Sequence, residues 1–311
     1  MRVHGTTEET QDRKASLRFA VWTTYSIGAL LLLNLDDLAL WSVFTVAGAL
    51  VLASFPALRP PVSPKIDRRD LVMIGTVYVV VVSSFWVAFV VFTTDNVLGL
   101  FLAFAFGLVA GVAGPVVYQV WIRRRDLASL GLGTHRLRRT ALAGVVLAGV
   151  QFSTTLWGYD LPAPVDWVPL LVMSMVVGFF EAVFFRGFVQ GRLEASLGPT
   201  AGVGGAAVLY SLYHVGYGMG VEELWFLFGL GVVYAIVFRL TTNILVLWPL
   251  LTPLGAFFNN LEAADIPLPW ESILGFADVA AVMAVVLWLA HRRIRRGATD
   301  SPERSRAEVP A

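Results

Sequence analysis

The chain of 311 residues contains no cysteine and few charged residues. Without cysteine there is no disulfide scaffold, no iron–sulfur cluster, no thiolate zinc site and no Cys nucleophile. Charged side chains make up 14% of the residues and hydrophobic ones 57%, whereas soluble domains average about 25% and 45–50%. So little polar surface cannot cover the chain in water, which excludes a soluble enzyme and a disordered protein. The formal net charge of +1 gives no global field that would attract nucleic acid.

Long apolar runs are abundant instead. A helix that crosses a bilayer core needs about 20 mostly apolar residues. The apolar runs predict an all-α, polytopic membrane helix bundle with about ten transmembrane segments. Because several segments are shorter than 20 residues, the expected range is about eight to ten. The segments are Leu17–Asn34, Leu38–Phe55, Leu71–Phe92, Val97–Trp121, Thr140–Trp157, Val168–Gln190, Ala201–Val215, Leu224–Phe238, Asn243–Phe258 and Ser272–Ala290.

The positions of the basic residues give an independent test of this topology. If the N-terminus is inside, all 23 Lys and Arg residues fall in the inner segments. The charged residues of the outer links are all acidic, among them Asp36, Asp95, Asp160, Glu223 and Glu271. Because basic residues are retained on the cytoplasmic side during insertion, the pattern predicts an even number of spans with both termini in the cytoplasm.

Composition divides the chain into five parts. The basic link contains the stretch from Asp126 to Gly133, which predicts a short surface helix ended by glycine. The first apolar run follows a polar stretch with Glu8 and Glu9, and no small-residue cleavage site follows it, so we expect no signal peptide. The parts are a cytoplasmic N-terminal tail (1–16), a four-span region (17–121), the basic link (122–139), a six-span membrane domain (140–290) and a basic, flexible cytoplasmic tail (291–311).

Ionisable groups in the apolar zone gather in the second half of the chain. Glu181 lies well inside the sixth segment, and Arg186 lies near its inner end. His214, in the seventh segment, is the only histidine of the hydrophobic zone. Intramembrane ionisable residues are costly and usually functional. A Glu and a His on neighbouring helices can deprotonate a trapped water and later protonate a leaving amine, which suits peptide hydrolysis.

Two simpler interpretations remain open. Glu181 and Arg186 can form a buried ion pair that only locks the bundle, and His214 can be a satisfied core residue. Segment lengths also place Glu181 and His214 at depths that differ by several Å, which helix tilt or a deeper start of the seventh segment would correct. The chemistry predicts no cofactor and no metal site, because catalytic zinc takes about three protein ligands and only two are present in this zone.

The motifs in this half resemble those of a known family. Their order is Glu181-x-x-x-Phe-Arg-Gly-Phe, then Tyr210-x-x-x-His214, then Phe226-x-x-Gly229-x-x-x-x-Tyr234, and then Thr-Asn-Ile-x-x-x-Trp-Pro ending at Pro249. This order is similar to that of the CPBP family, the CAAX prenyl protease and bacteriocin-processing (Abi) membrane proteins. The resemblance covers about Leu127–Leu261.

The resemblance implies roles for individual residues. Glu181 would be the water-activating base, His214 its partner and Arg186 a support for the Glu helix, with Tyr210 as the aromatic residue of the second motif. The family's second Glu is replaced by Ala182. Its third-motif His, which binds the developing oxyanion, is replaced by Thr252. Either Thr252 or Asn259, seven residues on and on the same helix face, would have to substitute; a helix-packing hydroxyl is an equally good interpretation of Thr252.

The resemblance implies a membrane-embedded, metal-independent endopeptidase in a plasma membrane of the bacterial type. Its partners would be the lipid bilayer and a membrane-bound or lipid-modified peptide or protein substrate, with no nucleic acid. The departures at Ala182 and Thr252 support an alternative, a catalytically impaired protease-like membrane protein that acts as a binding or scaffold protein. A transporter is weaker, because transporters often contain inverted repeats and none is evident.

Overall fold

The computed structural model describes residues 4–34, 37–58, 63–134, 136–263 and 268–299, and all regular structure in these ranges is helical. The expected all-α class is therefore confirmed. Nine of the ten predicted apolar segments are mostly helical, and the ninth, Asn243–Phe258, is α-helical only from Leu251. The α-helices are α1 (His4–Leu31), α2 (Leu38–Ser54), α3 (Arg68–Trp86), α4 (Val97–Val117), α5 (Leu137–Thr155), α6 (Pro164–Glu181), α7 (Gly191–Leu197), α8 (Pro199–Leu212), α9 (Val221–Thr241), α10 (Leu251–Ala263) and α11 (Ser272–Thr299).

Six helical stretches among the described residues are long and apolar enough to cross a membrane on their own. Others are shorter: α8 has 14 residues and rises about 21 Å, less than the roughly 30 Å of a hydrocarbon core. The predicted count of ten spans is therefore not confirmed. The six stretches are Arg13–Asn34, Arg68–Phe92, Thr94–Ile122, Pro164–Leu197, Val221–Thr241 and Ser272–Gly297.

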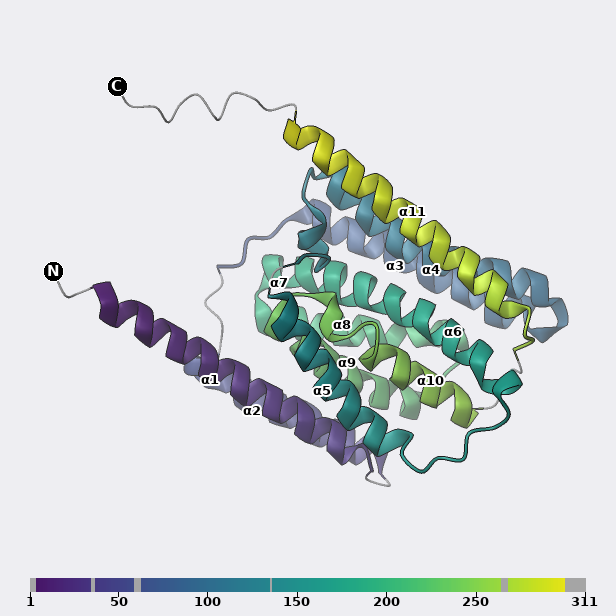
Figure 1. The fold of residues 1–311 in the computed structure, drawn as a ribbon, viewed down its shortest axis with the longest axis horizontal. Coiled ribbons are helices and arrows are strands. Elements are labelled where there is room, and N and C mark those ends of the chain that lie inside the picture. Colours follow the sequence, from purple (N-terminus) through teal and green to yellow (C-terminus); the bar gives the residue numbers. More distant parts are fainter. Residues whose placement is uncertain (1–3, 35–36, 59–62, 135, 264–267, 300–311) are drawn as a thin grey trace.

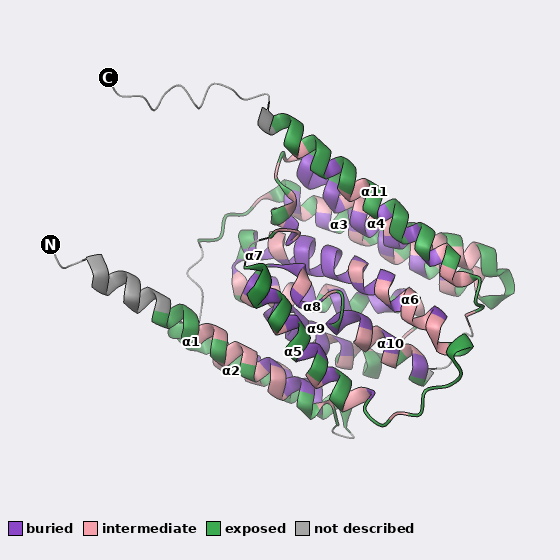
Figure 2. Ribbon diagram, in the orientation of Figure 1, coloured by how far each residue is buried: buried purple, intermediate pink, exposed green. Residues whose placement is uncertain are grey.

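The bundle has a central group of helices and two flanking groups (Figure 1). Helices α6, α8, α9 and α10 lie in the middle, α1 and α2 cover one side together with α5, and α3, α4 and α11 cover the other. Burial follows this arrangement, since the central ribbons are mostly buried and the outer ones largely exposed (Figure 2). The outer helices thus present their apolar side chains to the surface that lipid would cover.

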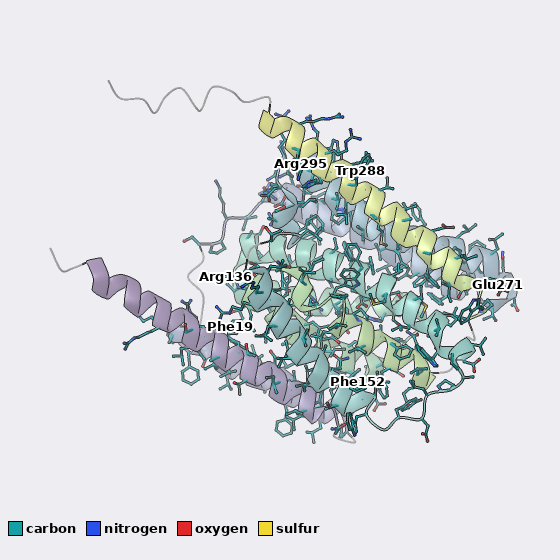
Figure 3. The ribbon with its side chains drawn as sticks, viewed as in Figure 1. Phe19, Arg136, Phe152, Glu271, Trp288 and Arg295 are labelled. Atoms are coloured by element: carbon teal, nitrogen blue, oxygen red, sulfur yellow. The ribbon has the colours of Figure 1, made fainter. Side chains whose placement is uncertain are left out.

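The two ends of the bundle differ in charge. Arg136, at the start of α5, and Arg295, near the end of α11, lie toward one end, and Glu271 lies at the opposite end (Figure 3). The first turn of α1 and the last turn of α11 lie toward the arginine end (Figure 1). This arrangement agrees with the charge partition of the sequence, while the side of the membrane that each end faces stays a prediction.

Helices extend into both predicted tails. Helix α1 begins at His4, and α11 continues to Thr299, so residues 4–16 and 291–299 are helical. Both stretches are rich in Glu, Gln, Lys, Arg or Ala, which favour helix wherever packing does not decide otherwise. Residues 1–3 and 300–311 of the predicted tails lie outside the described residues.

The basic link packs against the bundle. Its predicted short helix is present as a 3₁₀-helix, Leu127–Leu130, capped by the Asp126 side chain and ended by Gly131 in the left-handed conformation at φ 73°. Leu130 is fully buried, so this helix is packed into the protein and does not lie free on its surface. A Cβ atom at Gly187 would lie 2.3 Å from the Leu130 carbonyl oxygen, which explains the need for glycine there.

Candidate active site

A helical hairpin carries Glu181 and His214. Its first arm is one long stretch, Pro164–Leu197. The chain then reverses at Gly198, which has a φ of 90° that glycine adopts readily, and Pro199 begins α8 at the position that suits proline. Glu181 lies 17 residues before Gly198 and His214 lies 16 residues after it. Arms of nearly equal length bring the two residues to the same level.

This hairpin removes the depth mismatch expected from the sequence. The mismatch follows from a predicted sixth segment that ends at Gln190, whereas the helical stretch continues to Leu197. The apolar run ends there, but the polar residues that follow are still helical. With the turn at Gly198, neither helix tilt nor a deeper start of the seventh segment is needed to bring Glu181 and His214 to similar depths.

Tyr213 connects the two arms. Its hydroxyl group donates a short hydrogen bond to Oε1 of Glu181, and both side chains are buried. The ring of Tyr213 lies beside that of His214, with centroids 3.9 Å apart. Glu181 and His214, both among the described residues, share no direct hydrogen bond. They are therefore neighbours of the same tyrosine.

The orientation of His214 is fixed through one ring nitrogen. Residues 213–217 form a 3₁₀-helix, Tyr213–Tyr217, that follows α8 directly. Nδ1 of His214 lies 2.9 Å from the carbonyl oxygen of Tyr210. A carbonyl group can only accept, so Nδ1 carries the proton and donates it to this bond. The second ring nitrogen, Nε2, is then the basic one, available to accept a proton or a hydrogen bond.

A π-helix places Arg186 near Glu181. Directly after Glu181, the residues Ala182–Gln190 form a π-helix, in which backbone hydrogen bonds join residues five apart. In an α-helix, two residues five apart point in directions about 140° different. In the wider π-helix they lie about one turn apart, on the same side. The local backbone therefore turns Arg186 toward the face that carries Glu181.

Arg186 is buried but makes no ion pair with Glu181. No ion pair of Arg186 occurs among the described residues, and its Nη1 and Nη2 atoms have no hydrogen-bond partner there. The guanidinium group lies over the ring of Tyr210, 4.8 Å from its centroid. Such a cation–π contact stabilises the charge without using its N–H groups. Glu181 and Arg186 therefore attract each other electrostatically but are not joined by the direct contact of an ion pair.

Further polar groups surround this centre. Tyr210, Tyr217 and Tyr234 lie within electrostatic reach of Glu181. The hydroxyl group of Tyr234, on α9, lies 3.5 Å from Oε1 of Gln151 on α5. The polar side chains thus come from several elements of the central group, whereas most of their surroundings are aromatic and aliphatic. This is the concentration of polar groups that a reaction centre in a membrane requires.

Thr252 and Asn259 lie differently on α10. The Thr252 hydroxyl group is buried and donates to the backbone carbonyl of Gly178, 3.3 Å away on α6. A hydroxyl that packs two helices together makes this kind of bond. Asn259 is exposed and bonds to none of the residues around Glu181. An oxyanion role for either residue stays a prediction.

Other motif residues hold the elements in place. Asn243 donates from Nδ2 to the carbonyl oxygen of Gly133, 2.7 Å away, and so ties the region after α9 to the basic link. The indole N–H of Trp248 donates to the Met175 carbonyl oxygen at 2.9 Å. Asn243 and Trp248 thus serve to hold neighbouring elements together.

Metal-binding side chains do not cluster in the part of the chain that the structure describes, since no group of three or more His, Asp or Glu side chains comes together there. The polar centre around Glu181 therefore presents one carboxylate and one imidazole as groups able to take part in proton transfer.

Tyr213 is the functional candidate that sequence reasoning missed. The resemblance implies a role for Tyr210 and none for Tyr213, the residue next to His214. A signal existed, since a tyrosine hydroxyl in an apolar zone needs a partner and Glu181 was the obvious acceptor. Which of the two hydroxyl groups, that of Tyr210 or that of Tyr213, reaches Glu181 depends on the rotation of the helix about its axis, which the sequence does not give.

Comparison with known proteins gives one match. Residues 163–250 match the family model described as Rce1-like, type II CAAX prenyl endopeptidase Rce1-like. The matched residues include Glu181, Arg186, Tyr210 and His214, and they lie within the part of the chain where the resemblance was found. The match confirms that resemblance and indicates a CAAX-protease-like membrane protein. No curated protein and no solved structure matches the chain.

Proposed function

We propose that this protein is a membrane-embedded endopeptidase that hydrolyses a peptide bond in a membrane-associated or lipid-modified substrate, with Glu181 and His214 activating water. The observation that carries the proposal is the hydrogen bond from Tyr213 to Glu181 directly beside the His214 ring. It joins a base and an imidazole from two helices at one buried position. The family match over residues 163–250 supports the same class of reaction.

The proposed reaction uses each group for one task. A water molecule between the two side chains gives a proton to the Glu181 carboxylate as its oxygen attacks the scissile carbonyl carbon. Nε2 of His214 accepts a hydrogen bond from the same water and orients it. When the C–N bond breaks, the proton held by Glu181 passes to the leaving amine. The products are a carboxylic acid and an amine, so the atoms balance.

Tyr213 has a positioning role in this proposal. Its hydroxyl donates to Oε1 of Glu181, which stabilises the charged carboxylate and fixes its rotation. One carboxylate oxygen is thereby occupied, and the other remains for water. Such positioning matters because general-base catalysis depends on an approach within hydrogen-bond distance.

Arg186 is the best placed donor for the oxyanion. Its two terminal nitrogens are buried and have no partner among the described residues, and the π-helix turns its side chain toward Glu181. The Thr252 hydroxyl, in contrast, donates to a backbone carbonyl. A preorganised donor aimed at the developing negative charge raises the catalytic rate by a factor of about 10²–10³. We propose that Arg186 supplies this donor where the family's third-motif histidine is absent.

The decisive experiment replaces Glu181 by Gln, which keeps the shape and removes the base. The full-length protein in lipid vesicles is incubated with a fluorogenic peptide carrying a C-terminal prenylcysteine motif, and cleavage is followed by fluorescence and mass spectrometry. We expect Glu181→Gln to lose activity by at least about 10³-fold. The matched control Glu223→Gln changes an exposed carboxylate at the start of α9 and should cleave like the unchanged protein. Equal cleavage by both variants would exclude this mechanism.

A second candidate function is favoured by two substitutions. Ala182 and Thr252 stand where the family has Glu and His, which suits a catalytically impaired protein that binds a membrane partner. This candidate predicts that Glu181→Gln inserts normally and retains partner binding and cellular function. Loss of cellular function in a stably inserted Glu181→Gln protein would argue for the enzyme.

A further inference from the structure

A polar pocket lies where three membrane-spanning stretches end. One stretch begins at Arg68, another ends at Ile122 and a third ends at Leu197. Between these ends is a pocket of about 600 Å³ that is lined in part by Ala195 and Ser196. Because the apolar stretches stop here, the pocket lies at the level where a bilayer core gives way to lipid headgroups. It is separate from Glu181, which lies 14 residues before Ala195 in the same helical stretch.

Positive charge dominates the pocket. Its two acidic residues, Asp67 and Asp70, are outnumbered by basic ones. The basic residues that line it are Lys65, Arg68, Arg69, Arg123 and Arg125. Even with both carboxylates ionised, the lining carries an excess of three positive charges. An anion is the ligand that such a lining favours.

Two of the arginines are held in place by the carboxylates. Buried Asp70 accepts a hydrogen bond from Arg125 Nη1 at 3.0 Å and another from the Tyr118 hydroxyl at 2.7 Å. Arg123 forms an ion pair with Asp67, and its Nε lies 3.5 Å from Asp70. These contacts fix the two guanidinium groups before any ligand arrives. Preorganised donors bind with less loss of side-chain entropy.

The remaining basic groups are free of such contacts. Lys65, Arg68 and Arg69 are exposed, and none forms an ion pair within the part of the chain that the structure describes. The first amides of α3 are not available as an anion site, because the Asp67 side chain accepts from those of Arg69 and Asp70. The free charge of the pocket therefore resides in its side chains.

Apolar groups border the same pocket. Ile66, one of its lining residues, is 65% exposed, and Ile122, at the end of its membrane stretch, is 64% exposed. A free phosphate ion would leave both uncovered, whereas a lipid would cover them with the upper part of its acyl chains. We propose that this pocket binds the phosphate headgroup of an anionic phospholipid of the surrounding membrane. Basic pockets between helices at the membrane surface are suited to such headgroups.

The test uses the full-length protein in a neutral detergent, titrated with phosphatidylglycerol or phosphatidylcholine and followed by native mass spectrometry. We expect one tightly bound phosphatidylglycerol and no comparable binding of phosphatidylcholine. The variant Arg68→Gln/Arg69→Gln should bind phosphatidylglycerol about thirtyfold more weakly, because each of the two basic groups near an anionic lipid contributes about 1 kcal/mol. The variant Arg68→Lys/Arg69→Lys, which keeps the charge, should retain most of the affinity.

The control variant Arg138→Gln/Arg293→Gln removes two exposed charges from α5 and α11, outside the pocket. It should bind phosphatidylglycerol like the unchanged protein. Equal weakening in the control and the pocket variant would overturn the proposal, because it would show that overall charge alone attracts the lipid. Displacement of phosphatidylglycerol by equimolar inorganic phosphate would overturn it too, since the ligand would then be a free anion.

Discussion

The central and outer helices have similar hydropathy but very different surroundings. Within Pro164–Leu197, an 18-residue window has a mean hydropathy of 2.2 and 61% of it is buried in the protein, whereas the corresponding window of Ser272–Gly297 has 2.3 and 22%. Hydropathy therefore indicates that a helix lies in the membrane but not where it lies in the bundle. The two stretches differ in the burial of their ionisable side chains, because Glu181 and Arg186 of the central stretch are buried, whereas Asp278 of the outer stretch is exposed. A buried polar group is tolerated where other helices supply its partners.

The two regions also differ in how closely their backbones are approached. At Gly187, in the central stretch, an added Cβ would meet the backbone of Leu130. At Gly75, on the outer helix α3, an added Cβ would meet nothing within 4 Å. Small residues in membrane helices allow close packing only where a neighbour uses the space. Substitutions that add the same methyl group to each region should therefore have opposite effects.

The largest effect is expected from this pair of glycines. Gly187→Ala should destabilise the protein by about 2–3 kcal/mol, because neither backbone can move easily and overpacking has this magnitude. Gly75→Ala should be neutral or stabilise α3 by about 0.5–1 kcal/mol, the usual gain for replacing glycine in a helix. Thermal unfolding of both variants in one detergent measures the difference. Equal loss of stability would mean that the close contact at Leu130 is wrong.

A smaller effect is expected from a pair of tyrosines. Tyr213→Phe removes the hydrogen bond to Glu181 and should lower peptide cleavage by about ten- to a hundredfold, as expected for a bond to a charged group. Tyr78→Phe removes a bond of 3.2 Å from outer helix α3 to the carbonyl oxygen of Leu209. It should leave the cleavage rate unchanged. A similar loss of rate in both variants would indicate a general structural effect and would remove Tyr213 from the proposed site.

The smallest effect is expected from acid pH at the start of α3. Burial raises the pKa of the Asp67 carboxyl group, but the backbone amide of Asp70, the charge of Arg123 and the amide of Arg69 outweigh this and hold the pKa below its ordinary value. Because the pKa of Asp67 is lower in the folded than in the unfolded state, the stabilisation that its ionised carboxylate gives the folded protein is fully present above the unfolded-state pKa. It is lost as the pH falls through the folded-state pKa.

Asp67→Asn should therefore lose thermal stability at neutral pH and show a weaker decline in the acid range than the unchanged protein. Thermal midpoints between pH 7 and the acid range at low salt measure this, and added salt should reduce the difference because the charges are solvent-accessible. An unchanged acid decline in Asp67→Asn would assign the effect to other carboxylates.

The sequence predicted the positions of the apolar helices better than their ends. Nine of the predicted segments are mostly helical, because long apolar runs are a strong local signal, whereas the ninth, Asn243–Phe258, becomes α-helix only from Leu251. The boundary at Gln190 was missed because polar residues 191–197 continue the helix, held by packing of Glu194 against Gly202 of α8. Contacts of this kind are tertiary and leave no mark in hydropathy.

Within the candidate site, the sequence identified the residue types but not their pairing. Glu181 and His214 stood out because lone ionisable groups are conspicuous in an apolar zone. The roles of Tyr213 and of the free Arg186 donors depend on rotation about the helix axes, and a π-helix changes that rotation without any recognisable motif. Thr252 shows the same dependence on geometry. Its position in the sequence suits a helix-packing hydroxyl and an oxyanion donor equally well, and in the structure the hydroxyl bonds to α6.

The wide turns of Ala182–Gln190 also set the orientation of the helix that follows them. If these residues rewound as ordinary α-helix at unchanged length, the rotation per residue would rise to about 100°. Everything that follows would turn with them, and Glu194 would leave Arg239, its ion-pair partner on α9. The π-helix thus links the anchoring of the hairpin at one end to the direction of Glu181 at the other.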